Sequence, residues 1–366
     1  MTERDDATTE PAGDAPAAVL LGISSMIRIE RALWVAARLA LADHLHQLAG
    51  ARAHLDGAGS APRPDSPGRP HPGDRVVSVD DLAAAADADA DSVYRVLRVL
   101  ASAGIFSEVT PRGFVATPLS NPLRSDAADS VREAILQQGG EHEWRVWGEI
   151  LHTVRTGEPA FERVWGESPW RYYAATRGRM TQVSRADSAA LAGHPLFSGA
   201  RHIIDVAGGE GDFLAAVLAA NPGACGTLID LPAIVETAGA LLDRAGVADR
   251  CDVVPGDMFE SVPSGGDLYL LKRALHDWND ERARALLRSI HRAMDGRGCL
   301  VILTAILPAG DAPSSAKLGD LALMVMLGGR HRTEAELTEL LREAGFSVLE
   351  VVELPSPLSG VVAAPL

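Results

Sequence analysis

The second half of the chain alternates short apolar runs with stretches predicted as helices. Apolar runs such as 203–206, 226–231 and 301–306 are rich in Val, Ile and Leu. Runs of this kind predict strands that are buried on both faces. Strands that alternate with helices form a parallel, doubly wound sheet. We therefore predict an α/β fold, with a Rossmann-like domain over residues 191–366.

The first half of the chain has a helical pattern. Residues 20–46 carry apolar side chains on more than one face of a long predicted helix, which therefore needs a partner. Ser78–Asp81 resembles a capping box at the start of another helix. Two short helices and a two-stranded hairpin are predicted next, at 82–86, 92–102, 105–109 and 113–116. This order of elements indicates a winged helix within an N-terminal helical domain, residues 20–190.

Two polar segments lack any periodicity. Residues 1–19 contain mostly Asp, Glu, Thr, Ala and Pro, a composition that predicts a disordered tail. Residues 51–75 are dense in Gly, Pro, Arg and His, which predicts a mobile insertion between elements. We expect neither segment to contribute to a core.

The composition limits the classes of partner. The formal net charge is −15 and the sequence pI is about 5.2, which argues against nucleic acid or an anionic membrane surface. Cys225, Cys251 and Cys299 are widely spaced and predict neither a disulfide framework nor a metal site. The polar N-terminus lacks a signal core, and apolar runs are too short to span a membrane. We expect a soluble, cytoplasmic protein without a metal.

A winged helix can bind DNA, and Arg95 and Arg98 on its second helix are the candidate phosphate contacts. The neighbouring Asp87, Asp89 and Asp91 would repel DNA. The sequence therefore favours a structural winged helix. A regulator that senses a ligand through this domain is the less favoured alternative.

The apolar run 203–206 leads into a glycine-rich turn at Gly208, Gly209 and Gly211. A phosphate-binding loop would need a Lys-Ser or Lys-Thr pair, which is absent. A dinucleotide fingerprint would need a small residue where Leu214 stands. Glu210, between the glycines, suits a cofactor with ammonium and sulfonium charges better than one with phosphates. This pattern favours S-adenosylmethionine (SAM).

Acids follow the next two predicted strands. Asp230 stands where an α/β fold places the acid that binds ribose hydroxyls. Asp257 offers a carboxylate for an exocyclic amine, and the apolar Met258 and Phe259 beside it suit a purine ring. The alternative, a solvated loop carboxylate, becomes less favoured when both acids follow successive strands. These residues extend the predicted SAM site.

Aromatic residues gather in the helical segment between about 131 and 192. Four of the tryptophans lie there, together with His142, Tyr172, Tyr173 and Met180. Side chains of this kind line pockets for flat aromatic ligands. The alternative is that they pack only between helices.

These motifs together resemble SAM-dependent O-methyltransferases of the plant caffeate and flavonoid type and their actinobacterial natural-product relatives. The resemblance covers nearly the whole chain. Its motifs are found at Asp205–Gly211, Asp230–Pro232, Gly256–Phe259, Lys272–Trp278 and Gly328–Thr333. The resemblance implies an N-terminal domain that builds a homodimer, a SAM domain, and methyl transfer to a hydroxyl of an aromatic or polyketide-type small molecule.

The resemblance also implies roles for individual residues. His276 would be the general base. The residues expected at the cofactor are Asp205, Gly208, Gly209, Gly211, Asp230, Leu231, Asp257, Met258, Phe259 and Lys272. The residues expected at the substrate are His142, Trp144, Met180, Asp277, Trp278, Thr304 and His331.

The chain departs from the plant pattern beside His276. The plant members carry glutamate at the positions of Thr304 and His331. Without these carboxylates, His276 lacks the partners that would fix its tautomer and stabilise its cation, unless Asp277 or the substrate takes over. This departure motivates a second hypothesis, in which a diverged member uses SAM for hydroxylation, decarboxylation or rearrangement.

Overall fold

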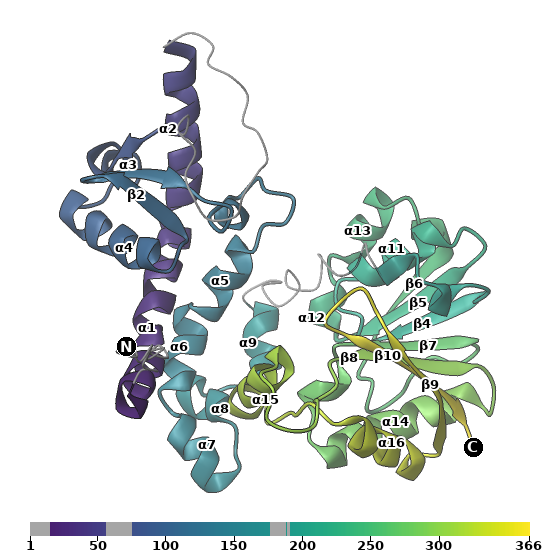
Figure 1. Ribbon diagram of the computed structural model, residues 1–366. Helices are drawn as coiled ribbons and strands as arrows, with labels where there is room; N and C mark the ends of the chain where they lie inside the picture. Colours follow the sequence, from purple (N-terminus) through teal and green to yellow (C-terminus); the bar gives the residue numbers. More distant parts are fainter. Residues whose placement is uncertain (1–14, 56–74, 176–187, 189–190) are drawn as a thin grey trace, which may run out of the picture. The chain divides into compact units, whose positions relative to one another are not determined.

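The computed structural model describes residues 15–55, 75–175, 188 and 191–366 (Figure 1). The chain divides into two compact units, Met1–Gly140 and Glu141–Leu366. This division falls earlier in the chain than the predicted boundary between residues 190 and 191. The helices between Glu141 and Ala175 therefore group with the sheet of the C-terminal unit.

Two helices begin the N-terminal unit. α1 spans Pro16–Arg38 and α2 spans Leu41–Leu55, and Ala40 between them has a positive φ of 51°. The single helix predicted for 20–46 is therefore wrong, because the left-handed residue ends the first helix. Residues 16–19, assigned to the tail, are helical, as are residues 51–55 of the expected insertion. Residues 1–14 and 56–74 lie outside the described part.

The winged helix follows these helices. Its elements are β1 Val77–Ser78, α3 Val79–Ala85, α4 Ala90–Ser102, β2 Phe106–Thr110 and β3 Gly113–Ala116, with strand order β1-β3-β2. The Ser78 side chain caps α3 by accepting a hydrogen bond from the backbone N–H of Asp81 at 3.1 Å. Leu82, Leu97 and Phe106 are buried in its core. The 3₁₀ turn η1, Asn121–Leu123, and α5, Arg132–Gln138, complete this unit.

A seven-stranded sheet forms the centre of the C-terminal unit, with strand order β6-β5-β4-β7-β8-β10-β9. The strands are β4 His202–Val206, β5 Cys225–Asp230, β6 Cys251–Pro255, β7 Leu268–Lys272, β8 Cys299–Thr304, β9 Phe346–Glu353 and β10 Ser359–Pro365. β4 to β8 are parallel, and β10 pairs antiparallel with both β8 and β9. The predicted doubly wound, Rossmann-like α/β fold is confirmed.

Helices cover both faces of this sheet (Figure 1). One face packs against α14 and α16, and the other against α11 and α13. The helices along the chain are α11 Asp212–Ala220, α12 Pro232–Val235, α13 Ala238–Arg244, α14 Asp280–Met294, α15 Ser315–Met326 and α16 Glu334–Glu343. All five residues of β7 are buried, which explains the apolar and aromatic run of its first four residues; the fifth, Lys272, is a buried charged residue.

The helices before the sheet form a separate apolar cluster with α15. They are α6 Glu141–Trp147, α7 Ile150–Thr156, α8 Ala160–Trp165 and α9 Pro169–Ala175. Val146, Phe161 and Val325 are fully buried where these elements meet. This packing joins the aromatic segment of the chain to the sheet unit.

None of the helices in the described ranges is long and apolar enough to cross a membrane. Within the same ranges, no group of three or more His, Cys, Asp or Glu residues is arranged to hold a metal ion. Cys225, Cys251 and Cys299 are free thiols.

The burial of β7 predicts the effect of a core truncation. Leu270→Ala removes a fully buried side chain from the centre of the sheet and leaves a cavity. We expect it to lower the free energy of unfolding by about 2 to 5 kcal/mol. The matched control is Leu349→Ala on β9, where the side chain is 63% exposed and the expected change is below about 0.5 kcal/mol. Urea unfolding measures both, and equal losses would contradict the assigned core.

Candidate functional site

A cavity of about 510 Å³ lies at the carboxyl edge of the parallel strands. Ala207, Asp230, Gly256 and Arg273, which end or directly follow β4, β5, β6 and β7, contribute to its wall. The strand order reverses at β4, and ligands of doubly wound sheets bind outside the carboxyl ends at such a point. The cavity is therefore the candidate functional site.

The glycine turn brings the backbone close to this cavity. Gly209 and Gly211 have positive φ angles of 66° and 89°, which other residues rarely adopt. A Cβ on Gly208 would lie 2.5 Å from the Oδ2 atom of Asp205 and 2.5 Å from the Cδ1 atom of Leu228. Gly208 and Gly211 therefore shape the turn, whereas Gly209 itself lines the cavity.

The turn fixes the carboxylate of Asp230 in the cavity wall. The Oδ2 atom accepts a hydrogen bond from the backbone N–H of Gly209 at 2.8 Å, and the Oδ1 atom accepts one from Leu231 at 2.7 Å. Burial raises the pKa of Asp230, and the two backbone hydrogen bonds oppose that shift. A carboxylate held in this way is positioned to accept hydrogen bonds from ligand hydroxyls.

Asp205 and Lys272 lie behind the cavity wall. Asp205 is 1% exposed, and neither carboxylate oxygen has a hydrogen-bond partner among the described residues. Burial raises its pKa to about 7, and the charge of Lys272 opposes this shift. The Nζ atom of Lys272 is 5.0 Å from the ring centroid of Phe213. Both predicted cofactor residues are thus near the turn without lining the cavity.

Aromatic rings and one guanidinium group form another wall. Trp170 and Trp278 are stacked with their ring centroids 5.2 Å apart, and Phe259 meets Trp278 edge to face at 4.9 Å. The guanidinium carbon of Arg282 lies 4.3 Å from the ring centroid of Phe259 and 4.6 Å from that of Trp278. The result is a mostly apolar wall, in which the stacked rings of Trp170 and Trp278 suit a planar ligand.

The loop after β6 contributes the residues next to this wall. Asp257 accepts a hydrogen bond from the backbone N–H of Phe259 at 2.8 Å, which tightens the turn. Asp257, Met258 and Phe259 all line the cavity, together with Leu231. The structure therefore brings this predicted cofactor group together around Asp230.

His276 lies in the short 3₁₀ turn η5, Leu275–Asp277, and is itself buried. Its Nδ1 atom is 3.4 Å from the Oγ1 atom of Thr304, and its Nε2 atom is 3.5 Å from Oδ1 of Asp277. Burial, with the charges of His331, Arg273 and Arg332, lowers the pKa of His276 to about 3. Burial also raises the pKa of Asp277 well above its usual value. The imidazole is therefore neutral at physiological pH.

The segment around His331 is held against His276. The two imidazole centroids are 4.8 Å apart, with the rings edge to face. The backbone N–H of His331 donates to Oδ1 of Asp320 at 2.7 Å, and that of Arg330 donates to the carbonyl oxygen of His276 at 2.8 Å. A Cβ on Gly329 would overlap the backbone of His276. The close approach of these two backbone segments therefore requires glycine.

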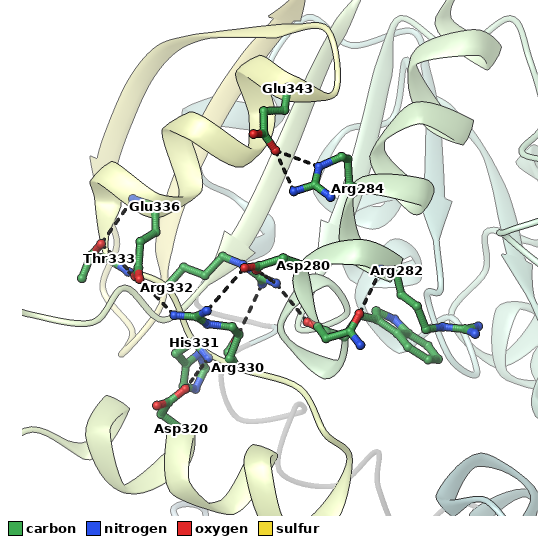
Figure 2. A network of polar contacts seen from close by, with 12 residues as sticks. Asp280, Arg282, Arg284, Asp320, Arg330, His331, Arg332, Thr333, Glu336 and Glu343 are labelled. Atoms are coloured by element: carbon green, nitrogen blue, oxygen red, sulfur yellow. Dashed lines mark hydrogen bonds and ion pairs between the residues drawn. The ribbon is translucent and has the colours of Figure 1, made fainter. Parts of the chain in front are cut away.

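Figure 2 shows how arginine side chains anchor this segment. Arg332, 4% exposed, donates from Nε to Oδ1 of Asp280 at 2.9 Å and from Nη2 to the carbonyl oxygen of Trp278 at 3.0 Å. Arg330 bridges Asp280 and Glu336 at 3.4 and 2.9 Å. A charge buried as deeply as that of Arg332 requires such a partner. The anchor also fixes the backbone next to His276.

The predicted substrate residues divide into several groups. Asp277 and Trp278 line the cavity, whereas Thr304 and His331 are buried beside His276. Two others lie on α6: His142 is buried against Tyr172 and Tyr173, and Trp144 is 39% exposed and does not line the cavity. Met180 lies outside the described residues.

The cavity also contains residues that the sequence did not indicate. They are chiefly Ala233, Ile234, Glu236, Thr237, Arg273 and Arg282. A helix predicted to start at Pro232, directly after β5, could have indicated Ala233 and Ile234. Arg273 has a positive φ of 55° at the end of β7, which a sequence pattern does not reveal.

Comparison with known proteins identifies the family. A family model described as the O-methyltransferase domain matches residues 147–347. The chain is 36% identical to the phenazine O-methyltransferase PhzM of Lysobacter antibioticus over 100% of both chains. It is 38% identical to the O-demethylpuromycin-O-methyltransferase of Streptomyces alboniger, over 78% of this chain and 80% of that protein.

A solved structure supports the same assignment. It is an O-methyltransferase from neocarzinostatin biosynthesis in complex with SAM and 2-hydroxy-5-methyl naphthoic acid. It is 28% identical, with a TM-score of 0.74, and the match covers 92% of this chain and 96% of that one. The chain therefore belongs to the O-methyltransferase domain family of SAM-dependent enzymes.

Proposed function

We propose that this enzyme transfers a methyl group from SAM to a hydroxyl oxygen of a planar aromatic small molecule in specialised metabolism. The observation that carries the proposal is the cavity itself, which combines the fixed carboxylate of Asp230 with the aromatic wall around Trp278. The similar proteins named above act in phenazine, puromycin and neocarzinostatin chemistry, and the last is bound to a naphthoic acid.

The residues of the cavity fit SAM. We assign the ribose hydroxyls to Asp230, whose carboxylate is held by backbone N–H groups of the glycine turn. Asp257 offers an acceptor for an exocyclic amine beside the apolar side chains of Met258 and Phe259. When bound, SAM supplies a methyl group activated by a positively charged sulfur.

Because SAM supplies the activated methyl group, the protein itself has to position the acceptor and exclude water. Methyl transfer requires the acceptor oxygen in line behind the activated methyl group, so positioning dominates the catalysis. His276 itself does not line the cavity; its neutral imidazole is buried next to the lining residue Asp277. Thr304 and Asp277, in contact with its two nitrogens, restrict the orientation of the ring.

We also propose a homodimer in the cytoplasm. The first half of α1 exposes a row of large apolar side chains, namely Val19, Leu20, Ile23, Met26 and Ile27. Exposed apolar patches of this kind mark protein interfaces. The resemblance to homodimeric O-methyltransferases supports the same interpretation, and the free thiols suit a reducing compartment.

The first prediction concerns the reaction. With SAM and a panel of hydroxylated naphthoates, phenazines and quinones, we expect at least one product heavier by a single methyl group. S-adenosylhomocysteine should form in equal amount, because each transfer consumes one donor. Mass spectrometry measures both. SAM binding without a methylated product across the panel would contradict methyl transfer.

A second prediction concerns the donor site. Asp230→Asn removes the charge that accepts hydrogen bonds in the cavity wall, so the affinity for SAM should fall roughly 10- to 100-fold. Calorimetric titration with SAM measures this change. The control is Asp243→Asn, an exposed carboxylate on α13, which should bind SAM as the unmodified enzyme does. Equal affinity in the two variants would remove Asp230 from the site.

A third prediction concerns assembly. Leu20, Ile23 and Ile27 are 68%, 60% and 50% exposed in the single chain, so changing all three to Glu should prevent their burial between copies. We expect a dimer of the unmodified chain and a monomer of the triple variant, measured by light scattering after size-exclusion chromatography. Arg28→Glu, at an exposed polar position of the same helix, controls for charge and should remain dimeric. A monomeric unmodified chain would refute the interface.

A further inference from the structure

The two polar side chains of the turn η5 differ in their access to the cavity. Asp277 lines the cavity, and its side chain is 12% exposed. His276 does not line the cavity, although its Nε2 atom is 3.5 Å from Oδ1 of Asp277. The backbone of the turn is held in place, because a Cβ on Gly329 would overlap the carbonyl group of Asp277. The group that this turn presents to a ligand is therefore the carboxyl group of Asp277.

That carboxyl group is also the acid of the cavity wall with the fewest partners. Three other acids in the wall already accept hydrogen bonds within the protein, namely Glu210, Asp230 and Asp257. A fourth, Glu236, is exposed. Among the described residues, the polar contact found for the side chain of Asp277 is the one with His276. This contact leaves lone pairs of the carboxyl group that a ligand hydroxyl can use.

The imidazole of His276 is placed to hold this carboxyl group. Its Nδ1 atom is 3.4 Å from the Oγ1 atom of Thr304, whose hydroxyl can donate to it. A neutral imidazole has a proton on one nitrogen only, so a hydrogen bond from Thr304 to Nδ1 leaves that proton on Nε2. The Nε2–H group then faces Asp277, and the ring has no lone pair for an acceptor hydroxyl. A glutamate at position 304 would accept from Nδ1 instead and would free the lone pair of Nε2.

Charged groups from the ends of two strands act on Asp277. Burial raises the pKa of its carboxyl group well above the ordinary value of 3.8, Arg273 after β7 opposes this shift, and Asp230 after β5 adds to it. The segment that packs on η5 contributes His331 and Arg332, which act on the neighbouring imidazole. A raised pKa makes a carboxylate a stronger base, and a positively charged ligand in the cavity favours its ionised form. Both effects suit the removal of a proton from a phenol, whose pKa is about 10.

Building on the proposed function, we infer that Asp277 contacts the acceptor hydroxyl and receives its proton, while His276 is a positioning residue that holds the carboxylate. The hydroxyl proton moves to an Oδ atom of Asp277 as the oxygen lone pair forms the O–CH₃ bond. The S–CH₃ bond breaks with its electron pair remaining on sulfur. The products are a methyl ether, S-adenosylhomocysteine and a protonated Asp277, which returns its proton to solvent when the products leave. The family resemblance, in contrast, implies that His276 is the base.

A kinetic experiment tests the role of Asp277. Asp277→Asn removes the base with little change in shape, so with the weakly acidic acceptor 1-naphthol we expect kcat at pH 8 to fall about 100-fold or more. With 4-nitro-1-naphthol, which is already ionised at that pH and needs no base, the fall should be below about fivefold. The control Asp243→Asn, at an exposed position of α13, should leave both rates unchanged. A similar loss with both acceptors, or no loss with 1-naphthol, overturns the inference.

The positioning role of His276 has a separate readout. His276→Gln keeps a side-chain N–H group near Asp277, whereas His276→Phe removes it. The Gln variant should retain at least about one fifth of kcat with 1-naphthol. For the unmodified enzyme, kcat/KM should rise with pH as Asp277 loses its proton, and the Phe variant should shift this midpoint upward by about one unit, because a hydrogen-bond donor favours the carboxylate. A loss of about 100-fold in the Gln variant with an unchanged midpoint in the Phe variant would assign the proton to His276 instead.

A binding measurement tests the hydroxyl contact without turnover. Enzyme saturated with S-adenosylhomocysteine is titrated with 1-naphthol or with 1-methoxynaphthalene, which has no hydroxyl hydrogen, and ligand fluorescence is recorded. Asp277→Ala should weaken the binding of 1-naphthol about fivefold or more and that of 1-methoxynaphthalene less than about twofold. Equal changes for the two ligands, or failure of the unmodified complex to bind 1-naphthol, would contradict the contact.

The outcomes separate this inference from the proposed function. If Asp277→Ala selectively weakens 1-naphthol binding and no methylated naphthol forms, methyl transfer to these acceptors fails while the hydroxyl contact stands. If the unmodified enzyme and the Asp277→Asn variant methylate 1-naphthol equally well, methyl transfer stands and the role of Asp277 fails.

Discussion

The burial of charged groups is the constraint on which the C-terminal unit depends. At the carboxyl edge of its sheet, Asp205, Lys272, Asp277 and Arg332 are all nearly inaccessible to water. A buried charge needs a partner or must lose its charge. Arg332 meets this requirement by contacting Asp280 and the backbone of Trp278. Asp205 and Asp277 respond in the other way: burial raises the pKa of each carboxyl group, which favours its uncharged form.

The same constraint separates supporting residues from residues that contact a ligand. Asp205 is tied to the shape of the turn, because a side chain at Gly208 would collide with its carboxylate. Asp230 is held by the turn that this packing creates, and its carboxylate remains in the cavity wall. The position of Asp230 in the cavity wall thus depends on Asp205, a buried acid that does not itself line the cavity.

Much of the fold could be predicted because apolar runs and turn residues act locally. The buried residues of β7 and the glycine turn after β4 are examples, since each follows from a few adjacent residues. The break at Ala40 could not be predicted, because alanine normally continues a helix. Arg273 was also missed, because a positive φ at the end of a strand depends on the surrounding structure. The backbone conformations of Ala40 and Arg273 are determined by packing between segments that are distant in the sequence.

The contact between Gly329 and His276 shows how this fold can vary its chemistry without losing its framework. The backbone of residues 329–332 is fixed by glycine, by the N–H groups of Arg330 and His331, and by the Arg332 side chain. None of these anchors uses the side chain of His331. That side chain can therefore be an acid or an imidazole while the backbone stays in place. Because it faces His276, its identity affects the electrostatic environment of that imidazole.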